Sequence, residues 1–265
     1  MNGDKPKNIK EYREWLKAEL GVEISHRDEM HYDSATAKVK RDFEQSAFWI
    51  NLVKNYEEFD SQYQLQKGVP LWMQNLKPEL QVKTFTSFEL KTFRKNVLEN
   101  KNWPNEIDDG WILPKNWYSR INDVVRTLFV VRYLDGVQFV IDKVQNLCRQ
   151  QGLPACEVSF EAREEGYYAA HLYTTQEFEI PKVTWDTERV KISIEVQITT
   201  QLQEIIRKLL HKYYEERRKR LEKDDVKWQW NYKSDEFATN YLGHILHYVE
   251  GMIMDIREKQ KEKIP

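Results

Sequence analysis

The chain is poor in cysteine and has no long apolar run. Its 265 residues include only Cys148 and Cys156, which are too few for a disulfide framework and lack the spacing of a metal-binding cluster. No apolar stretch approaches the length that crosses a membrane, and the first residues lack the apolar core of a signal peptide. We therefore expect reduced cysteines and a cytoplasmic protein with no membrane partner.

An excess of charge of either sign is also absent. The 41 lysines and arginines nearly balance the 43 aspartates and glutamates, which leaves a net charge of −2. The chain as a whole therefore does not indicate nucleic-acid binding, and any contact with RNA must come from a local basic patch. Aromatic residues are abundant, with nine Trp, fourteen Tyr and eleven Phe, so there is enough apolar surface for a core.

Helical periodicity dominates both ends of the chain, and strand patterns dominate its middle. Helices are expected at residues 8–20, 35–66, 87–100, 135–151, 201–223 and 234–261. Strands are expected at residues 126–134, 156–163, 168–180 and 189–199, and a loop at 105–117. This order predicts an α+β fold with a mixed sheet in a single domain. Its parts are N-terminal helices (1–80), a core (81–223) and a C-terminal helix (224–265).

Several cations lie around the start of the third expected helix. Lys83 precedes it, and Lys91, Arg94 and Lys95 share one of its faces at i+3 and i+4 spacing. Together with Ser87 they supply a hydroxyl, a helix N-terminus and positive charge, which are what a triphosphate needs. The alternative is a solvated cationic face with Ser87 as an ordinary N-cap.

Two carboxylates accompany the expected strands. Asp123 lies at the entrance to the first strand, and Glu195 lies inside an otherwise apolar, β-branched strand. A charge in such a strand is costly unless it acts on a metal or a cation. Carboxylates that converge at one end of a sheet can hold a magnesium ion. The alternatives are that Asp123 caps a turn and that strand alternation directs Glu195 outward.

An aromatic ring and an imidazole follow Gly166. Tyr167 can stack on a nucleobase, because the glycine lets the backbone approach and the ring offers a flat face. His171 can contact a phosphate. The ordinary alternatives are an edge-strand tyrosine and a half-buried histidine. Farther along, His211 falls among basic residues on an expected helix, where a plain surface role is the alternative.

Taken in chain order, these segments resemble the synthetase domain of the RelA/SpoT family. The family's ATP-binding stretch reads Arg-x-Lys, with Ser four residues later and Lys four after that, and it is matched here at Lys83, Ser87 and Lys91. The aspartate that opens a strand is matched by Asp123. The family's guanine-stacking loop reads Gly-Tyr-Arg-Ser-x-His and is matched at Gly166, Tyr167 and His171. Its acidic strand reads Glu-Val-Gln-Ile-Arg-Thr, followed later by Glu-His, and is matched at Glu195, Val196, Gln197, Ile198, Thr200 and His211. The resemblance covers roughly residues 83–214.

The chain departs from the family pattern mainly at positions where the family has cations. Gln81, Leu128, Tyr168 and Thr199 replace arginines, Arg126 replaces a glycine, and Leu210 replaces a glutamate. Because an acceptor diphosphate needs cations to offset its charge, the acceptor half of the site looks changed. The loop sequence Gly-Tyr-Tyr-Ala-Ala-His is similar to that of toxic small alarmone synthetases of toxin–antitoxin and phage-defence systems.

The resemblance implies an ATP-dependent pyrophosphokinase that transfers the β,γ-pyrophosphate of ATP to a nucleotide 3′-hydroxyl, with Mg²⁺ as cofactor. It places ATP against Lys83, Ser87, Lys91 and Arg94. It makes Asp123 and Glu195 both catalytic and metal-binding. It assigns the acceptor to Tyr167, His171, Gln197 and His211. The chain has no histidine-aspartate hydrolase motif, so synthesis without hydrolysis is implied.

Three functions remain open at this point. The favoured acceptor is the 3′-terminal adenosine of tRNA, which would make the protein a translation-blocking toxin with an antitoxin protein as a further partner. The second possibility is an enzyme that makes alarmones from GTP, GDP or an adenine nucleotide. The third is a catalytically dead, nucleotide-binding regulator. A tRNA backbone would need positive charge, for which the candidates are Lys38, Lys40, Arg41, Arg217, Arg218, Lys219 and Arg220.

Overall fold

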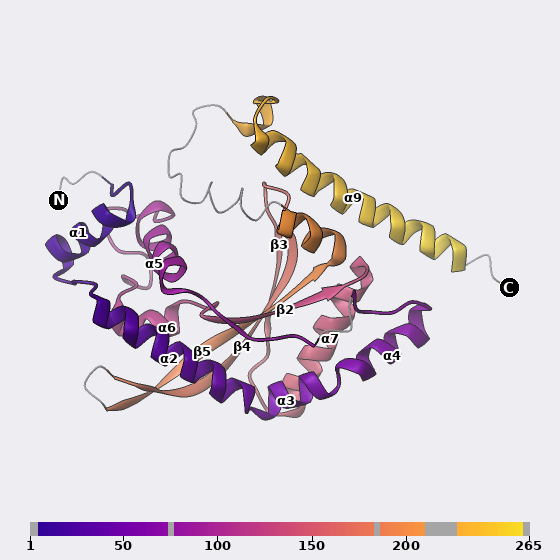
Figure 1. The fold of residues 1–265 in the computed structure, drawn as a ribbon, viewed down its shortest axis with the longest axis horizontal. Helices are drawn as coiled ribbons and strands as arrows, with labels where there is room; N and C mark the ends of the chain where they lie inside the picture. The colour runs from indigo at the N-terminus through magenta and orange to yellow at the C-terminus, as the bar shows by residue number, and fades with distance from the viewer. Residues whose placement is uncertain (1–4, 74–76, 183–185, 210–226, 262–265) are drawn as a thin grey trace. The chain divides into compact units, whose positions relative to one another are not determined.

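The computed structural model describes residues 5–73, 77–182, 186–209 and 227–261. Helices precede and follow a five-stranded sheet, so the predicted α+β class is confirmed (Figure 1). In the part of the chain described, no helix has both the length and the apolar character that a membrane crossing requires.

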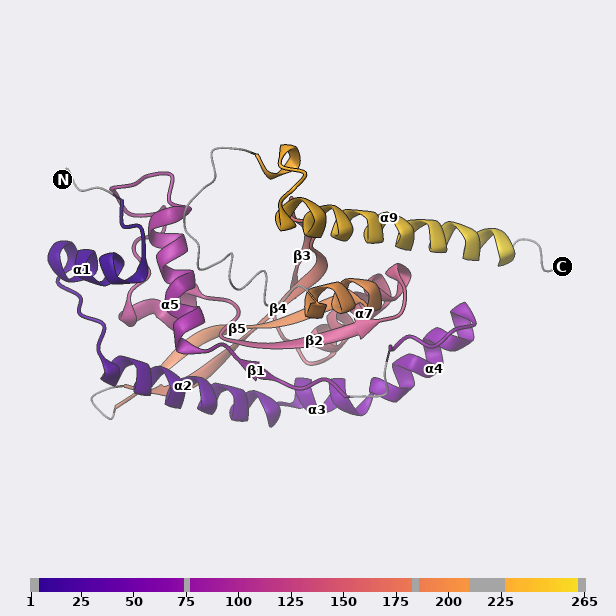
Figure 2. The same ribbon diagram turned by 45° about the horizontal axis from the view of Figure 1, so that its top comes forward.

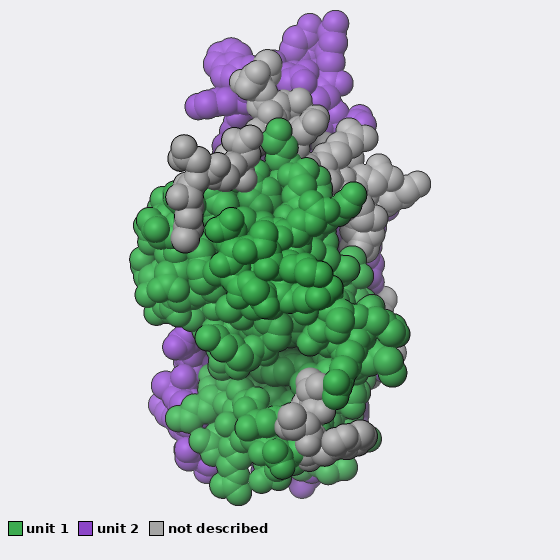
Figure 3. Space-filling view, turned by 90° about the vertical axis from the view of Figure 1, so that its left-hand side faces the viewer, with its two compact units in different colours: residues 1–46, 80–126, 175–195 green, residues 47–79, 127–174, 196–265 purple. Residues whose placement is uncertain are grey.

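The chain forms two compact units, which Figure 3 distinguishes by colour. Unit 1 comprises residues 1–46, 80–126 and 175–195, and unit 2 comprises residues 47–79, 127–174 and 196–265. Some strands pass from one unit into the other. The organisation as a single domain stays a prediction.

The sheet has the strand order β1-β2-β5-β4-β3. Its strands are β1 (Gln81–Val82), β2 (Val125–Val131), β3 (Glu157–Ala162), β4 (Tyr168–Pro181) and β5 (Thr187–Thr200). β1 pairs antiparallel with β2, and β3 and β4 form an antiparallel hairpin in which Ala162 lies opposite Tyr168. The four expected strands are present within a few residues. The two-residue β1 was not expected because it is too short to show an alternating pattern.

Unit 1 contains the helices that surround β1. They are α1 (Ile9–Leu20), α2 (His26–Glu44), α5 (Phe85–Phe93) with a π-helical continuation (Arg94–Leu98), a 3₁₀ turn (Pro114–Asn116) and α6 (Trp117–Arg120). Aromatic rings fill its interior, and the Tyr32 ring lies 4.5 Å from that of Phe88. The Tyr32 hydroxyl also donates to the carbonyl of Lys83 at 2.9 Å, which fixes the turn that leads into α5.

Unit 2 contains α3 (Ala47–Lys54), α4 (Tyr56–Lys67), α7 (Leu134–Gln150), a helical segment at 201–209, a 3₁₀ turn (Trp228–Trp230) and α9 (Asp235–Lys261). Figure 2 shows α9 as the long helix at the C-terminal end. In the interior of this unit the Tyr56 and Trp72 rings stack at 4.3 Å.

The single helix expected at residues 35–66 is wrong, because the chain forms α2, α3 and α4 there. After Glu44 the Ser46 N–H bonds the Phe43 carbonyl, a tight turn that ends α2. Asn55 separates α3 from α4. The apolar periodicity continues across both breaks, so periodicity alone could not reveal them. The helix also begins earlier than expected, at a capping box between Ser25 and Asp28.

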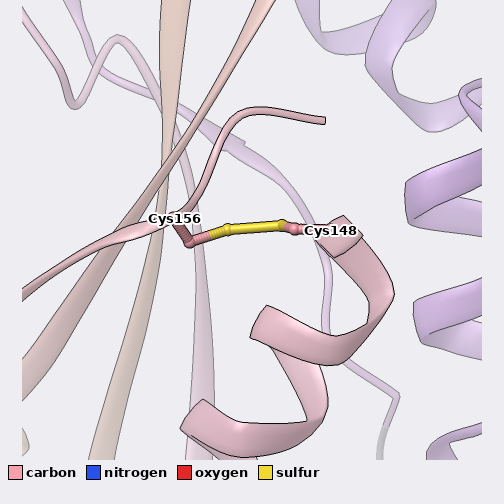
Figure 4. Close-up of a disulfide and its surroundings, with 2 residues drawn as sticks. All are labelled: Cys148 and Cys156. Carbon is pink, nitrogen blue, oxygen red and sulfur yellow. A yellow bond between two sulfur atoms is a disulfide. The ribbon is translucent and has the colours of Figure 1, made fainter. Parts of the chain in front are cut away.

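The two cysteines are joined in a disulfide, contrary to the expectation that they are unpaired (Figure 4). Cys148 lies near the end of α7, and Cys156 directly precedes β3. A tight turn in which Gly152 has a φ of 64° reverses the chain between them, and the Leu153 N–H bonds the Cys148 carbonyl at 3.0 Å. This turn brings together two residues eight apart. The cytoplasmic location stays a prediction.

Candidate active site

A buried carboxylate in unit 1 is bound by two lysines. Asp123 is 7% exposed. Its Oδ2 accepts a hydrogen bond from Lys83 Nζ at 2.9 Å, and its Oδ1 lies 2.8 Å from Lys91 Nζ. The sequence placed these three residues in one site, and the structure brings them into direct contact.

Local structure explains how the three side chains meet. The Lys83 N–H bonds the Val124 carbonyl at 2.9 Å, which continues the β1–β2 ladder and places Lys83 beside Asp123. The chain then turns into α5, so that Lys91 lies two turns into the helix. Thr84 is the N-cap of α5, and its Oγ1 accepts from the Ser87 N–H at 3.4 Å. The alternative in which Ser87 is the N-cap of this helix is therefore wrong, because Thr84 has that position.

Charge rather than burial determines the protonation of this carboxylate. Burial alone would raise the pKa of Asp123, but the ammonium groups of Lys91 and Lys83 outweigh it and lower the pKa to about 2. Burial lowers the pKa of Lys83, against the attraction of Asp123. Burial and the charge of Lys91 also lower the pKa of Lys95. Two lysines thus bind one carboxylate, with Lys95 as a further cation nearby, and the cluster is net positive.

The other expected ATP ligands lie on α5 and its continuation. Ser87 is exposed one turn before Lys91, and its hydroxyl accepts a hydrogen bond from Thr84 Oγ1 at 2.9 Å. Arg94 bonds the Glu99 carboxylate in a pair that is about half exposed. Contact of Ser87 and Arg94 with a phosphate stays a prediction.

Glu195 is buried in β5, the strand beside β2 in the sheet. Ile192, Ile194 and Val196 are fully buried on one face of β5, so alternation places Glu195 on the other face, with Ser193. Ser193 Oγ lies 2.9 Å from Thr175 Oγ1 on β4, so this face is polar. Glu195 is 4% exposed, which contradicts the alternative that it points into solvent.

The donor set determines what kind of metal site is possible. Among the residues that the structure describes, no three His, Cys, Asp or Glu side chains gather as metal ligands. Magnesium needs fewer, because water and substrate phosphates complete its shell. Both oxygens of Asp123 face lysine ammonium groups. A polyphosphate would draw the lysines away from Asp123 and leave its oxygens available to a metal. The residues therefore fit a Mg²⁺ ion that arrives with a polyphosphate and do not fit an ion bound alone.

The expected acceptor residues lie on the β3–β4 hairpin and on β5, in unit 2. The loop closes through a hydrogen bond from the Arg163 N–H to the Tyr167 carbonyl at 3.0 Å. Tyr167 is half-buried, and its hydroxyl lies 3.2 Å from Nε2 of the buried His171. Gln197 is half-buried on β5. His211 and the basic cluster at residues 217–220 lie outside the described residues.

Two arginines near Tyr167 were not predicted as site residues. The Arg163 guanidinium lies over the Tyr167 ring at 5.7 Å from its centroid. Arg207 interacts electrostatically with Tyr167 and donates to Glu204 at 2.6 and 2.8 Å. In the sequence Arg163 is followed by two glutamates, so the segment has a net negative charge and does not indicate a cationic site. Only the folded loop shows that this cation lies over the ring.

Gly166 has a structural role that the sequence did not indicate. Its φ is 78°, and a Cβ built on it would lie 2.5 Å from the Asn240 carbonyl oxygen of α9. The glycine therefore permits α9 to cross the hairpin closely, whereas we expected it to permit approach to a nucleobase. The Tyr168 ring stacks on that of His247 at 3.7 Å, and its hydroxyl lies 2.8 Å from His244 Nδ1.

Two of the three cations of the N-terminal basic cluster are paired with acids. On α2, Lys38 lies 2.5 Å from the Asp42 carboxylate, and Lys40 lies 3.7 Å from that of Glu44. Pairs of this i,i+4 kind are typical of a solvated helix face. A role of this cluster in tRNA binding stays a prediction.

Comparison with solved structures identifies the fold. The chain is similar to small alarmone synthetase 1 from Bacillus subtilis, with 13% identity, a TM-score of 0.53, and coverage of 89% of this chain and 97% of that one. It is also similar to a GTP pyrophosphokinase family protein from Streptococcus pneumoniae, with 17% identity, a TM-score of 0.50, and coverage of 96% and 98%. No family model matches the sequence. No curated protein matches it either.

These likenesses confirm the expected RelA/SpoT-type synthetase fold. One further structure of the Bacillus subtilis protein, at the same TM-score of 0.53 and 13% identity, contains its product pppGpp. The likeness extends over most of the length of both chains.

Proposed function

We propose that this chain is an ATP-dependent pyrophosphokinase that transfers the β,γ-pyrophosphate of ATP to a nucleotide 3′-hydroxyl. The observation that carries the proposal is the binding of Asp123 by Lys83 and Lys91 at the start of α5. An alarmone-synthetase fold supports it. The resemblance of Lys83 and Lys91 to the ATP-binding stretch of the RelA/SpoT family, and of Asp123 to its metal aspartate, supports it as well.

In the proposed mechanism Asp123 holds the two lysines in position until the nucleotide arrives. Their ammonium groups then turn to the phosphates of ATP, where positive charge stabilises the charge that develops during transfer. Mg²⁺ on Asp123 and Glu195 would supply further neutralisation of the phosphate oxygens. The pairing of Asp123 with two lysines keeps the empty site from holding unpaired buried charge.

Glu195 is the proposed general base. It would accept the proton of the acceptor 3′-hydroxyl as that oxygen bonds the β-phosphorus of ATP. The bond from the β-phosphorus to the oxygen that bridges it to the α-phosphate breaks, and AMP leaves. The burial of Glu195 on a polar strand face supports this role, since a buried carboxylate is held in a fixed position away from bulk water.

The proposed acceptor is the 3′-terminal adenosine of tRNA, and GTP, GDP or an adenine nucleotide is the second candidate. Tyr167 would stack on the acceptor base, with His171 and Gln197 beside it. The arginines expected at the positions of Tyr168 and Thr199 are absent, which favours an acceptor without a 5′-diphosphate to neutralise. Arg163 over the Tyr167 ring favours the second candidate, because it supplies one cation where a diphosphate would need it.

Transfer of a label from γ-labelled ATP tests both the reaction and the acceptor. The purified chain is incubated with labelled ATP, Mg²⁺ and one of GDP, GTP, unlabelled ATP or deacylated tRNA. Label on tRNA, with release of AMP, supports the toxin, and label on a mononucleotide supports the alarmone synthetase. No transfer to any of them would refute the proposal and leave the nucleotide-binding regulator.

Substitution of a lysine tests whether the candidate site carries out the transfer. Lys91→Gln should lower transfer about 100-fold, because it removes one cation from the developing phosphate charge. Lys101→Gln is the matched control, since Lys101 is an exposed lysine of the same unit. Equal activity of the two variants would remove Lys91 from the site.

A further inference from the structure

Unit 2 contains a cavity on the face of the sheet opposite to the expected acceptor residues. It has a volume of about 280 Å³ and is lined by residues of α7, β3, β4, β5, the helical segment at 201–209 and α9. Tyr168 and Ala170 of β4 line it. Because side chains alternate along a strand, these two lie on the face that does not hold Tyr167 and His171.

Strand β5 gives the same division between its two faces. Ile198 lines the cavity, whereas Gln197 alternates with it and lies on the other face. Thr200 also lines the cavity, and its hydroxyl donates to the carboxylate of Glu250 on α9. The cavity is therefore separate from the residues to which the acceptor nucleotide was assigned.

The walls of the cavity are mostly apolar. Leu134 and Val137 of α7 and Ile198 of β5 contribute aliphatic side chains, and Phe160 and Tyr168 contribute rings. Phe160 is 66% exposed, so its ring is available to a ligand. Pockets of this composition bind molecules with an apolar body, and rings in the wall favour an aromatic one. The volume is at the lower end of the range for ligand sites, which favours a small molecule.

A buried carboxylate belongs to the lining of this apolar cavity. Glu250 is 4% exposed, and its Oε1 accepts a hydrogen bond from Thr200. Its Oε2 has no hydrogen-bond donor among the residues that the structure describes, and His247 Nδ1 lies 3.5 Å from it. A buried carboxylate whose hydrogen bonds are incomplete is costly, so a ligand that brings N–H donors would reduce this cost.

The charges of the lining determine the polar group of the ligand. In the described part of the chain no lysine or arginine lines the cavity, and its second acid, Glu161, already accepts from Arg163 at 3.0 Å. Burial raises the pKa of Glu250, against the hydrogen bond from Thr200 and the charge of His247. A cation beside Glu250 would offset the effect of burial. A phosphate or a carboxylate would find no cation here.

We propose that this cavity binds a small aromatic amine, whose ammonium group bonds the Glu250 carboxylate and whose ring packs against Phe160 and the aliphatic side chains of α7. The bound molecule carries no phosphate, which distinguishes it from ATP and from the acceptor nucleotide. Its binding is measured directly, so the result does not depend on pyrophosphate transfer.

Three probes of similar shape and different charge test the ligand class, namely phenethylamine, phenethyl alcohol and phenylacetate. Titration of the full chain, followed by ligand-observed NMR, should show saturable binding of phenethylamine. It should bind at least about tenfold more tightly than the alcohol, because a hydrogen bond between charged groups is stronger than a neutral one. Phenylacetate should not bind. Equal affinity of the amine and the alcohol would overturn the proposal, and so would the absence of saturable binding of the amine.

A charge-removing variant locates the amine at Glu250. Glu250→Gln should weaken the binding of phenethylamine at least about tenfold, because the ammonium group loses its counter-charge. Glu258→Gln is the matched control, since Glu258 is an exposed glutamate about two turns farther along α9, and it should bind the amine as the unaltered chain does. Equal binding by the two variants would contradict the assignment. Circular dichroism checks that each variant is folded.

A second variant fills the cavity without touching the carboxylate, in case Glu250→Gln does not fold. Ala162 lines the cavity from an exposed position at the end of β3, so Ala162→Phe should abolish binding of the amine. Gln197→Ala, on the other face of β5, should keep it. Binding that is lost in Gln197→Ala and kept in Ala162→Phe would place the amine at the acceptor residues and refute a separate site.

Discussion

Nζ of Lys91, on α5, lies 2.8 Å from Oδ1 of Asp123, two residues before β2. This ion pair joins two segments 32 residues apart in the sequence and is completed by Lys83 on the other carboxylate oxygen. The carboxylate therefore has a structural role as well as a proposed catalytic one, and the two roles can be separated by experiment.

Replacing Asp123 by asparagine should affect both stability and transfer. The variant leaves Lys83 and Lys91 close together without their counter-charge, so we expect a loss of about 3 kcal/mol in the free energy of unfolding. Transfer should fall by at least about 100-fold at a temperature where the variant is folded. Urea denaturation and the label-transfer assay measure the two effects. Asp109→Asn is the control, because Asp109 is an exposed acid of the same unit and should change neither.

Stability should also fall in acid because of the same group. The pKa of Asp123 is about 2 in the folded chain and near 3.8 in the unfolded chain. Its stabilising effect is therefore complete above about pH 5 and is lost as the pH falls toward 2, with a total of about 2 kcal/mol. Urea denaturation at several pH values measures this slope. The Asp123→Asn variant should show a shallower dependence between pH 5 and pH 2, and an identical slope would contradict the assignment.

Substitution of Gly166 should be more costly than that of another glycine with positive φ. Gly166→Ala must adopt a φ near 78° and place its Cβ 2.5 Å from the Asn240 carbonyl, so we expect a loss of about 3 kcal/mol. Gly152→Ala, at a φ of 64° with open space around it, should cost about 1 kcal/mol. Thermal and urea denaturation compare the two variants. Equal losses would mean that α9 does not cross the hairpin as closely as described.

Two variants at Tyr167 should distinguish the contribution of its ring to acceptor binding from that of its hydroxyl. Tyr167→Ala should raise the acceptor KM about 10-fold or more, because stacking of a base on an aromatic ring contributes about 1–3 kcal/mol. Tyr167→Phe keeps the ring and loses the hydroxyl with its contact to His171, so the KM for the acceptor should change little. The KM for ATP should be unaffected in both. A large effect of Tyr167→Phe on the acceptor KM would assign the hydroxyl, and not the ring, to binding.

The sequence predicted the strands better than it predicted tertiary contacts. Alternation and β-branched residues identified β2, β3, β4 and β5, because each is long enough to show a pattern. The family resemblance assigned Lys83, Ser87, Lys91 and Asp123 to one site. It could not show that both lysines bind the same carboxylate, because this depends on the two-residue strand β1, which has no detectable pattern.

Tertiary contacts account for most of what was missed. The turn at Gly152 brings Cys148 to Cys156, and no local signal distinguishes a cysteine that will meet a partner from one that will not. Likewise, Gly166 was interpreted by its neighbours in sequence. The reason for a glycine there is α9, which lies more than 70 residues later.

The path of the chain through its two units has a consequence for engineering. The chain passes between them after residues 46, 79, 126, 174 and 195, and the last three of these points fall inside β2, β4 and β5. Neither unit is a continuous segment, so no single cut can release one intact, and a graft from a relative would need matched splices within three strands. Truncations at these points should therefore give insoluble fragments, and exchange of parts with proteins of similar fold is practical only for the terminal helices.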